Sequence, residues 1–143
     1  METLKDYIAA MDPLHRNRRL PEYGELYTKA LLKKVKDGSG IIYLAKQEEE
    51  VLGGIAGNIE EQSEYERAGT VRSRSGRILV LVVLEKYRGQ GIGLKLMKKL
   101  EDYFRLNGCD IVRVEVFVPN ASAHEFYSRL QYSDRVHDMI KQL

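Results

Sequence analysis

The sequence predicts an α/β fold: a mixed, mainly antiparallel sheet of about six strands flanked by four helices. Three observations support this prediction. Apolar residues recur at helical spacing before residue 37 and again between residues 91 and 106. Strand-like apolar runs occupy the middle of the chain, and helix and strand patterns alternate in the last third, which implies helices packed on a sheet. A length of 143 residues suits one domain, residues 1–143.

The first part of the chain is predicted to be helical. Leu4, Ile8 and Met11 follow helical spacing, and the first helix ends before Pro13. Apolar residues spaced three and four apart predict a second helix over residues 22–35.

The middle of the chain changes to strand periodicity. Residues 41–45 and 51–59 predict a hairpin around a polar turn. Residues 60–76 are charged and carry no apolar periodicity, so they predict a long loop. Residues 78–84 form a continuous run of β-branched residues and leucine, which predicts a strand buried on both faces.

In the last third of the chain, helices and strands are predicted to alternate. Residues 91–106 form an amphipathic helix, residues 111–118 an alternating strand, and residues 121–130 a short helix. Residues 135–142 predict a weak final strand. The closing segment, residues 132–143, offers an edge through which two copies could pair as a homodimer.

Composition excludes several classes of protein. The net charge of +2 is too balanced for a dedicated nucleic-acid binder. One cysteine, Cys109, rules out an internal disulfide, favours a cytoplasmic location, and is expected to be a buried small residue. The longest aliphatic run has seven residues, whereas a membrane-spanning helix needs about 20. The three histidines have no metal-ligand spacing, so no metal site is expected.

The most informative motif is Arg88-Gly89-Gln90-Gly91-Ile92-Gly93, between the buried strand and the amphipathic helix. Glycines let the backbone turn tightly and approach a ligand, and the helix start offers unpaired N–H groups and a positive dipole end. The motif therefore predicts a phosphate or pyrophosphate site, with Arg88 as a supporting cation. It is not a dinucleotide fingerprint, because Leu94 stands where the third glycine is required, and no Walker loop is present.

The wider pattern resembles the GCN5-related N-acetyltransferase (GNAT) family. Its signature is Arg/Gln-x-x-Gly-x-Gly/Ala after the fourth strand, here Arg88-x-x-Gly91-x-Gly93 after Leu81-Val82-Val83. A second element is an asparagine after the fifth strand with a tyrosine seven residues later, here Asn120 and Tyr127. The resemblance covers about residues 40–143.

This resemblance implies that acetyl-CoA lies between the fourth and fifth strands. Its pyrophosphate is expected on the backbone N–H groups of residues 88–93, and its pantetheine arm along the backbone of residues 81–83. Asn120 is expected to contact the arm, and Tyr127 to protonate the leaving thiolate. The activity implied is direct transfer of an acetyl group to a primary amine of a small molecule or peptide.

The sequence does not identify the base that deprotonates the amine. Many family members carry an acid on the fourth strand, but residues 78–84 hold none. Glu60, Glu61 and Glu115 are candidates, and a water chain is another route. The family usually opens with a strand, whereas residues 1–11 here have helical spacing.

The sequence also allows other functions for the chain and other roles for two of the candidate residues. The chain could bind acyl-CoA as a sensor without catalysis, use a longer acyl group, or act as an interaction domain through the basic segment at residues 16–19. Tyr127 could be a core residue of its helix, and Asn120 could be a helix cap.

Overall fold

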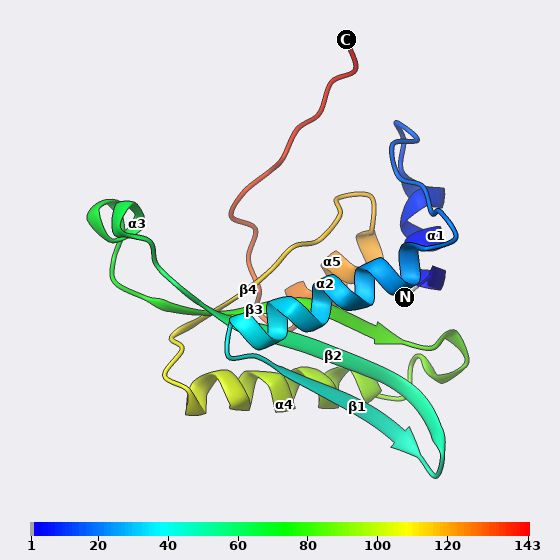
Figure 1. Ribbon diagram of the computed structural model, residues 1–143, viewed down its shortest axis with the longest axis horizontal. Coiled ribbons are helices and arrows are strands. Elements are labelled where there is room, and N and C mark those ends of the chain that lie inside the picture. The colour runs from blue at the N-terminus through cyan, green and yellow to red at the C-terminus, as the bar shows by residue number, and fades with distance from the viewer. Residues whose placement is uncertain (1) are drawn as a thin grey trace. The chain divides into compact units, whose positions relative to one another are not determined.

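The computed structural model describes residues 2–143 (Figure 1). Its helices are α1 (Glu2–Met11), α2 (Tyr23–Asp37), α3 (Glu64–Gly69), α4 (Ile92–Leu106), α5 (Ala121–Arg129) and the 3-10 turn η1 (Glu85–Tyr87). Its strands are β1 (Ile41–Gln47), β2 (Glu50–Glu61), β3 (Arg74–Val83) and β4 (Ile111–Val114). None of the described helices is long and apolar enough to cross a membrane.

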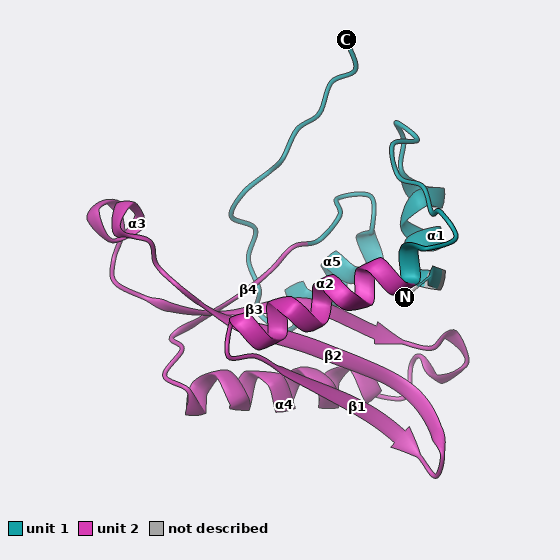
Figure 2. Cartoon of the chain, viewed as in Figure 1, with its two compact units in different colours: residues 1–24, 116–143 teal, residues 25–115 magenta. Residues whose placement is uncertain are grey.

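The chain divides into two compact units (Figure 2). One contains residues 1–24 and 116–143, and the other contains residues 25–115. The second unit holds the whole sheet together with α3, α4 and most of α2.

The sheet confirms the predicted mixed, mainly antiparallel arrangement. Its order is β1-β2-β3-β4, with β1–β2 and β2–β3 antiparallel and β3–β4 parallel. The strands predicted at residues 78–84 and 111–118 appear as β3 and β4. Four strands are present in the described part of the chain rather than about six.

The predicted final strand, residues 135–142, is irregular in the structure. Its apolar side chains are exposed, with Met139 at 91% and Val136 at 79%. An alternating pattern becomes a strand only where a neighbouring strand pairs with its backbone, and no strand in the described residues pairs with this segment.

The loop predicted over residues 60–76 contains α3, so the described residues hold five α-helices rather than four. Ser63 accepts a hydrogen bond from the Glu66 N–H, and the Glu66 carboxylate accepts from the Ser63 N–H at 2.8 Å. This reciprocal pair is a capping box, which stabilises a helix start by satisfying two unpaired N–H groups.

Helix α4 packs on one face of the sheet, as its amphipathic pattern predicts. Four side chains of α4 are buried: Leu96, Met97, Leu100 and Phe104. A Cβ atom at Gly57 of β2 would meet the Phe104 ring at 2.7 Å, so Gly57 lies beneath this helix. Burial of each large apolar side chain contributes about 1.5–3 kcal/mol, so this face stabilises the unit.

Strand β3 contains a bulge next to its last contact with β4. Ile78 pairs with Gly57 and Val80 pairs with Ala56, so Leu79 is an extra residue with no partner on β2. Ile78 is also the last residue of β3 that pairs with β4, opposite Val114. The strands β3 and β4 therefore stop pairing at the bulge.

The unit of residues 1–24 and 116–143 has two local centres. The buried Asp12 carboxylate accepts hydrogen bonds from the N–H groups of Leu14, Arg16 and Asn17 and from the Asn17 side chain, at 2.8–3.1 Å. Burial alone raises the pKa of a carboxyl group, but these hydrogen bonds outweigh it and lower the pKa of Asp12. The second centre is the ring of Tyr127, which contacts the rings of Phe126 and Tyr132 edge to face.

Candidate functional site: an open strand edge, a glycine loop and a charged cavity

The glycine motif forms the turn between η1 and α4. Gly89 and Gly91 have φ angles of 75° and 77°, in the left-handed region that favours glycine. A Cβ atom at either position would meet no atom within 4 Å. Backbone conformation, rather than crowding by the rest of the protein, therefore explains both glycines, and the space above them is open to a ligand.

The N-terminus of α4 presents backbone donors. Gly91 is the N-cap, no side chain caps the helix, and its first turn holds no acidic residue. Ile92 and Gly93 are its first two residues and are half-buried, whereas Gln90 is exposed. The first N–H groups of a helix lack partners within the helix and lie at its positive dipole end. The segment can therefore bind an anionic group such as a phosphate.

Arg88 links this turn to the end of β3. Its Nε donates a hydrogen bond to the carbonyl oxygen of Val83 at 3.2 Å, and its backbone N–H donates to the Glu85 carbonyl at 3.1 Å. The exposed Arg88 side chain is thereby directed along the end of β3.

Strand β3 has an open edge beyond the bulge. Its pairing with β4 ends at Ile78, yet β3 continues to Val83 with no strand of the described residues on that side. The Leu84 N–H donates to the Leu52 carbonyl at 2.9 Å, so residues 84, 82 and 80 bond toward β2. By alternation, Leu81 and Val83 direct their N–H and C=O groups toward the open edge, and Val82 directs its groups toward β2.

A charged cavity of about 380 Å³ lies beside the bulge. It is lined by Lys34, Asn58, Glu60, Arg77, Ile78, Leu79 and Glu115. Asn58 pairs with Arg77 across β2 and β3, one residue along from the pair Gly57 and Ile78. Because successive side chains alternate, Asn58 and Arg77 lie on the face opposite α4. The sheet thus separates the α4 face from the charged cavity.

Arg77 organises the cavity. Its Nε lies 3.2 Å from both carboxylate oxygens of Glu60, and its Nη1 lies 3.5 Å from Glu115. The Arg77 side chain is 16% exposed, whereas that of Glu115 is 92% exposed. Glu61, the third predicted acid, does not line the cavity, because it pairs with Arg74 at 2.6 Å.

Sequence reasoning did not identify Lys34, Asn58 or Arg77 as site residues. They belong to α2, β2 and β3, and only the strand register and the end of α2 bring them together. No local motif marks any of the three.

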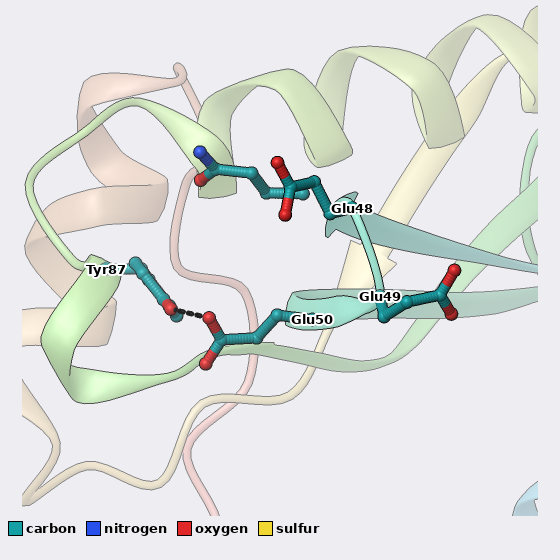
Figure 3. Close-up of a pocket in the computed structure, with 5 residues that line it drawn as sticks. Glu48, Glu49, Glu50 and Tyr87 are labelled. Carbon is teal, nitrogen blue, oxygen red and sulfur yellow. Dashed lines mark hydrogen bonds between the residues drawn. The ribbon is translucent and has the colours of Figure 1, made fainter.

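A second pocket lies at the β1–β2 turn and is lined by residues 47–50 and Tyr87 (Figure 3). Glu50 accepts hydrogen bonds from the Lys86 ammonium and the Tyr87 hydroxyl, and these bonds lower the pKa of its carboxyl group. The pocket contains no residue predicted to bind or react. Its hydrogen bonds attach η1 to the start of β2, which anchors the chain just before Arg88.

Tyr127 and Asn120 lie on α5 and at its start. Tyr127 is 8% exposed, and burial raises its pKa to about 12. No described residue hydrogen-bonds its hydroxyl group. Asn120 is the N-cap of α5, because its side-chain oxygen accepts a hydrogen bond from the Ala123 N–H at 3.2 Å. Asn120 therefore caps the helix.

An α/β domain with a parallel strand pair that stops pairing at a bulge, followed by a glycine turn and a helix, has the architecture of an acetyltransferase. The family model of the Acetyltransferase (GNAT) family matches residues 6–132. The chain therefore belongs to the GNAT family, as its motifs suggest.

Individual relatives agree with this assignment. An uncharacterized N-acetyltransferase of Methanocaldococcus jannaschii is 35% identical over 94 residues, which cover 65% of this chain and 53% of the relative. The N-alpha-acetyltransferase 30 of Schizosaccharomyces pombe is 34% identical over 71 residues, which cover 50% of this chain and 45% of the relative. The chain thus matches about half the length of these relatives.

The fold is also similar to that of a solved acetyltransferase. The crystal structure of glucosamine-6-phosphate N-acetyltransferase from Arabidopsis thaliana matches 99% of this chain and 91% of that chain, with a TM-score of 0.61 and 20% identity. This similarity concerns the fold alone.

Proposed function

We propose that this protein transfers an acetyl group from acetyl-CoA to a primary amine. The observation that carries the proposal is the continuous path from the open edge of β3, through Arg88, to the uncapped start of α4. We also propose that residues 1–143 act as one acetyltransferase domain, because the family match runs through both units.

The residues along this path suit a CoA thioester. The backbone N–H groups of residues 88–93 and the Arg88 guanidinium would hold the pyrophosphate. Leu81 and Val83 would pair with the amide-containing arm as a strand pairs with a sheet edge, while Val82 keeps β3 bonded to β2. Asn120 would contact the arm through its amide nitrogen. Acetyl-CoA supplies the acetyl group as an activated thioester.

Two groups would assist the transfer at the thioester. The Val83 N–H, directed toward the open edge, would stabilise the negative charge that develops on the carbonyl oxygen. The Tyr127 hydroxyl would donate a proton to the departing sulfur. With a tyrosine pKa of about 12 and a thiol near 8.5, this transfer is uphill by about 3.5 units, about 5 kcal/mol. We propose that the proton moves in concert with cleavage of the C–S bond.

The charged cavity suits the acceptor amine. We propose that Glu115 removes the proton from the ammonium group, because its carboxylate is 92% exposed and contacts Arg77 only at 3.5 Å. Glu60 is held by Arg77 through both oxygens and would bind the amine rather than react. Glu61 is less suitable because of its bond to Arg74. A water chain from the cavity to solvent is the alternative route.

The acceptor is a primary amine of a small molecule or a peptide. The name of the Schizosaccharomyces pombe relative, an N-alpha-acetyltransferase, supports including peptide α-amines among the candidates. We propose a cytoplasmic location on the basis of the single cysteine, and a homodimer formed through residues 132–143.

The test is isothermal titration with acetyl-CoA and, separately, with free CoA. We expect binding in the micromolar range that Gly91→Glu abolishes, because a carboxylate at this left-handed position repels the phosphates and strains the turn. Gly69→Glu is the matched control, because Gly69 also has open space around it but lies at the end of α3. Absence of binding up to millimolar acetyl-CoA would contradict the proposal.

An acyl-CoA sensor is the second candidate function. The raised pKa of Tyr127 favours it, because a weaker acid is a poorer proton donor. Micromolar acetyl-CoA binding without CoA release in a broad amine screen would support the sensor.

A further inference from the structure

We propose that the acceptor is amphoteric: beside its amine it carries a carboxylate or phosphate, which Lys34 binds in the charged cavity. The inference rests on the proposed acetyl transfer and names the chemistry of its second substrate.

The charges around Arg77 do not balance. One guanidinium lies between two carboxylates, those of Glu60 and Glu115, so the three side chains together carry one negative charge at neutral pH. The exposed oxygens of Glu115 are free to accept further hydrogen bonds from solvent or a ligand. This wall of the cavity therefore suits one ammonium group.

Lys34 of α2 supplies a second positive charge to the cavity. The Asn58 side-chain amide donates a hydrogen bond to the Lys34 carbonyl at 3.2 Å, which fixes the end of α2 over the cavity. Two other lysines of α2 are engaged on the helix itself: Lys29 with Glu25, and Lys33 with Asp37. Lys34 lines the cavity and forms no ion pair with any described residue, so its charge is available to an anion.

Two apolar residues of β3 also line the cavity. Ile78 and Leu79 line the cavity at the bulge, where β3 stops pairing with β4. Leu79, the extra residue of the bulge, is available to a short apolar spacer between the amine and the anion, whereas the Ile78 side chain lies with Gly57 on the α4 face. An acceptor held in this way would present its amine next to Glu115, which directly follows β4.

The experiment compares acceptors that differ only in charge, by measuring CoA release at saturating acetyl-CoA. The series is 4-aminobutanoate, its uncharged amide and butylamine, with 3-aminopropyl phosphate for the phosphate source. A peptide pair with aspartate or asparagine as the second residue tests a peptide source. We expect kcat/KM for the anionic acceptors to exceed that for the neutral ones by about fivefold or more, as one ion pair allows.

The Lys34→Glu variant should remove or reverse this preference, without changing the affinity for acetyl-CoA. Lys36→Glu is the matched control, because Lys36 lies two residues away on α2, is exposed and does not line the cavity. Equal rates for anionic and neutral acceptors, or equal effects of both variants, would overturn the inference while leaving acetyl transfer intact.

A binding measurement covers the case in which none of these acceptors turns over. In the presence of CoA, 4-aminobutanoate should bind more tightly than butylamine, and Lys34→Glu should remove the difference. No difference in binding would also overturn the inference. Failure of acetyl-CoA itself to bind would instead contradict the proposed function.

Discussion

Gly76 of β3 lies directly beneath the ring of Phe104 of α4, so close that a methyl group at residue 76 would overlap the ring. Phe104 is fully buried. This contact sets the distance between α4 and β3, and α4 carries the glycine turn at its other end. The spacing of the candidate phosphate site from the sheet therefore depends on a residue without a side chain.

Gly76→Ala should destabilise the protein by about 1–3 kcal/mol, because the added methyl group overpacks the core beneath Phe104. Urea denaturation followed by circular dichroism measures this change. Gly69→Ala is the control, because a Cβ atom at Gly69 meets nothing within 4 Å. Equal stability of the two variants would contradict the packing argument.

Tyr127→Phe separates catalysis from packing. The phenylalanine ring preserves the contacts with Phe126 and Tyr132, so we expect acetyl-CoA affinity to change little. Loss of the proposed proton donor should lower kcat about 100-fold or more, in the range typical of general acid catalysis. Steady-state kinetics and titration calorimetry measure both quantities, and an unchanged kcat would assign Tyr127 to the core alone.

The pKa of Tyr127 also predicts a difference in alkaline stability. Because burial raises this pKa from 10 to about 12, the folded protein holds the proton more tightly than the unfolded chain. The contribution is complete below pH 10 and is lost as the pH rises toward 12, by about 2–3 kcal/mol.

Urea unfolding from pH 9 to pH 11.5 tests this expectation by comparing the protein with Tyr127→Phe. The variant lacks the titrating group, so its free energy of unfolding should fall less steeply with pH. Parallel curves would show that Tyr127 titrates normally in the folded state.

Cys109 should react slowly with thiol reagents at neutral pH. Desolvation by burial raises the pKa of its thiol, which lowers the fraction of reactive thiolate. Labelling with 5,5′-dithiobis(2-nitrobenzoate) should proceed more slowly in the native protein than in urea-unfolded protein. Rapid native labelling would contradict this prediction, and slow labelling makes the reagent suitable for detecting CoA release.

The sequence predicted the elements whose signals are local. The amphipathic run of α4, the hairpin of β1 and β2, and the glycine turn each depend on residues a few positions apart. Helix α3 also had a local signal, Ser63 followed by Glu66, but the charged composition of residues 60–76 obscured it.

The predictions that failed depended on distant partners. Strand β4 ends at Val114 rather than Val118, because its pairing with β3 stops at the bulge of Leu79. Residues 135–142 have alternating character but no strand partner among the described residues. An alternating pattern specifies which side chains share a face, and not whether another strand lies beside it.

The candidate site likewise combines features predicted by local motifs with features that depend on distant residues. The sequence alone predicted the family, the proposed phosphate-binding turn and the candidate pair of Asn120 and Tyr127, because each is a motif of fixed spacing. Only the tertiary structure decided that Glu60 and Glu115 share one cavity while Glu61 bonds elsewhere, that Arg77 joins them, and that burial weakens Tyr127 as an acid. These properties arise from strand register and from burial, which bring together residues that no sequence spacing relates.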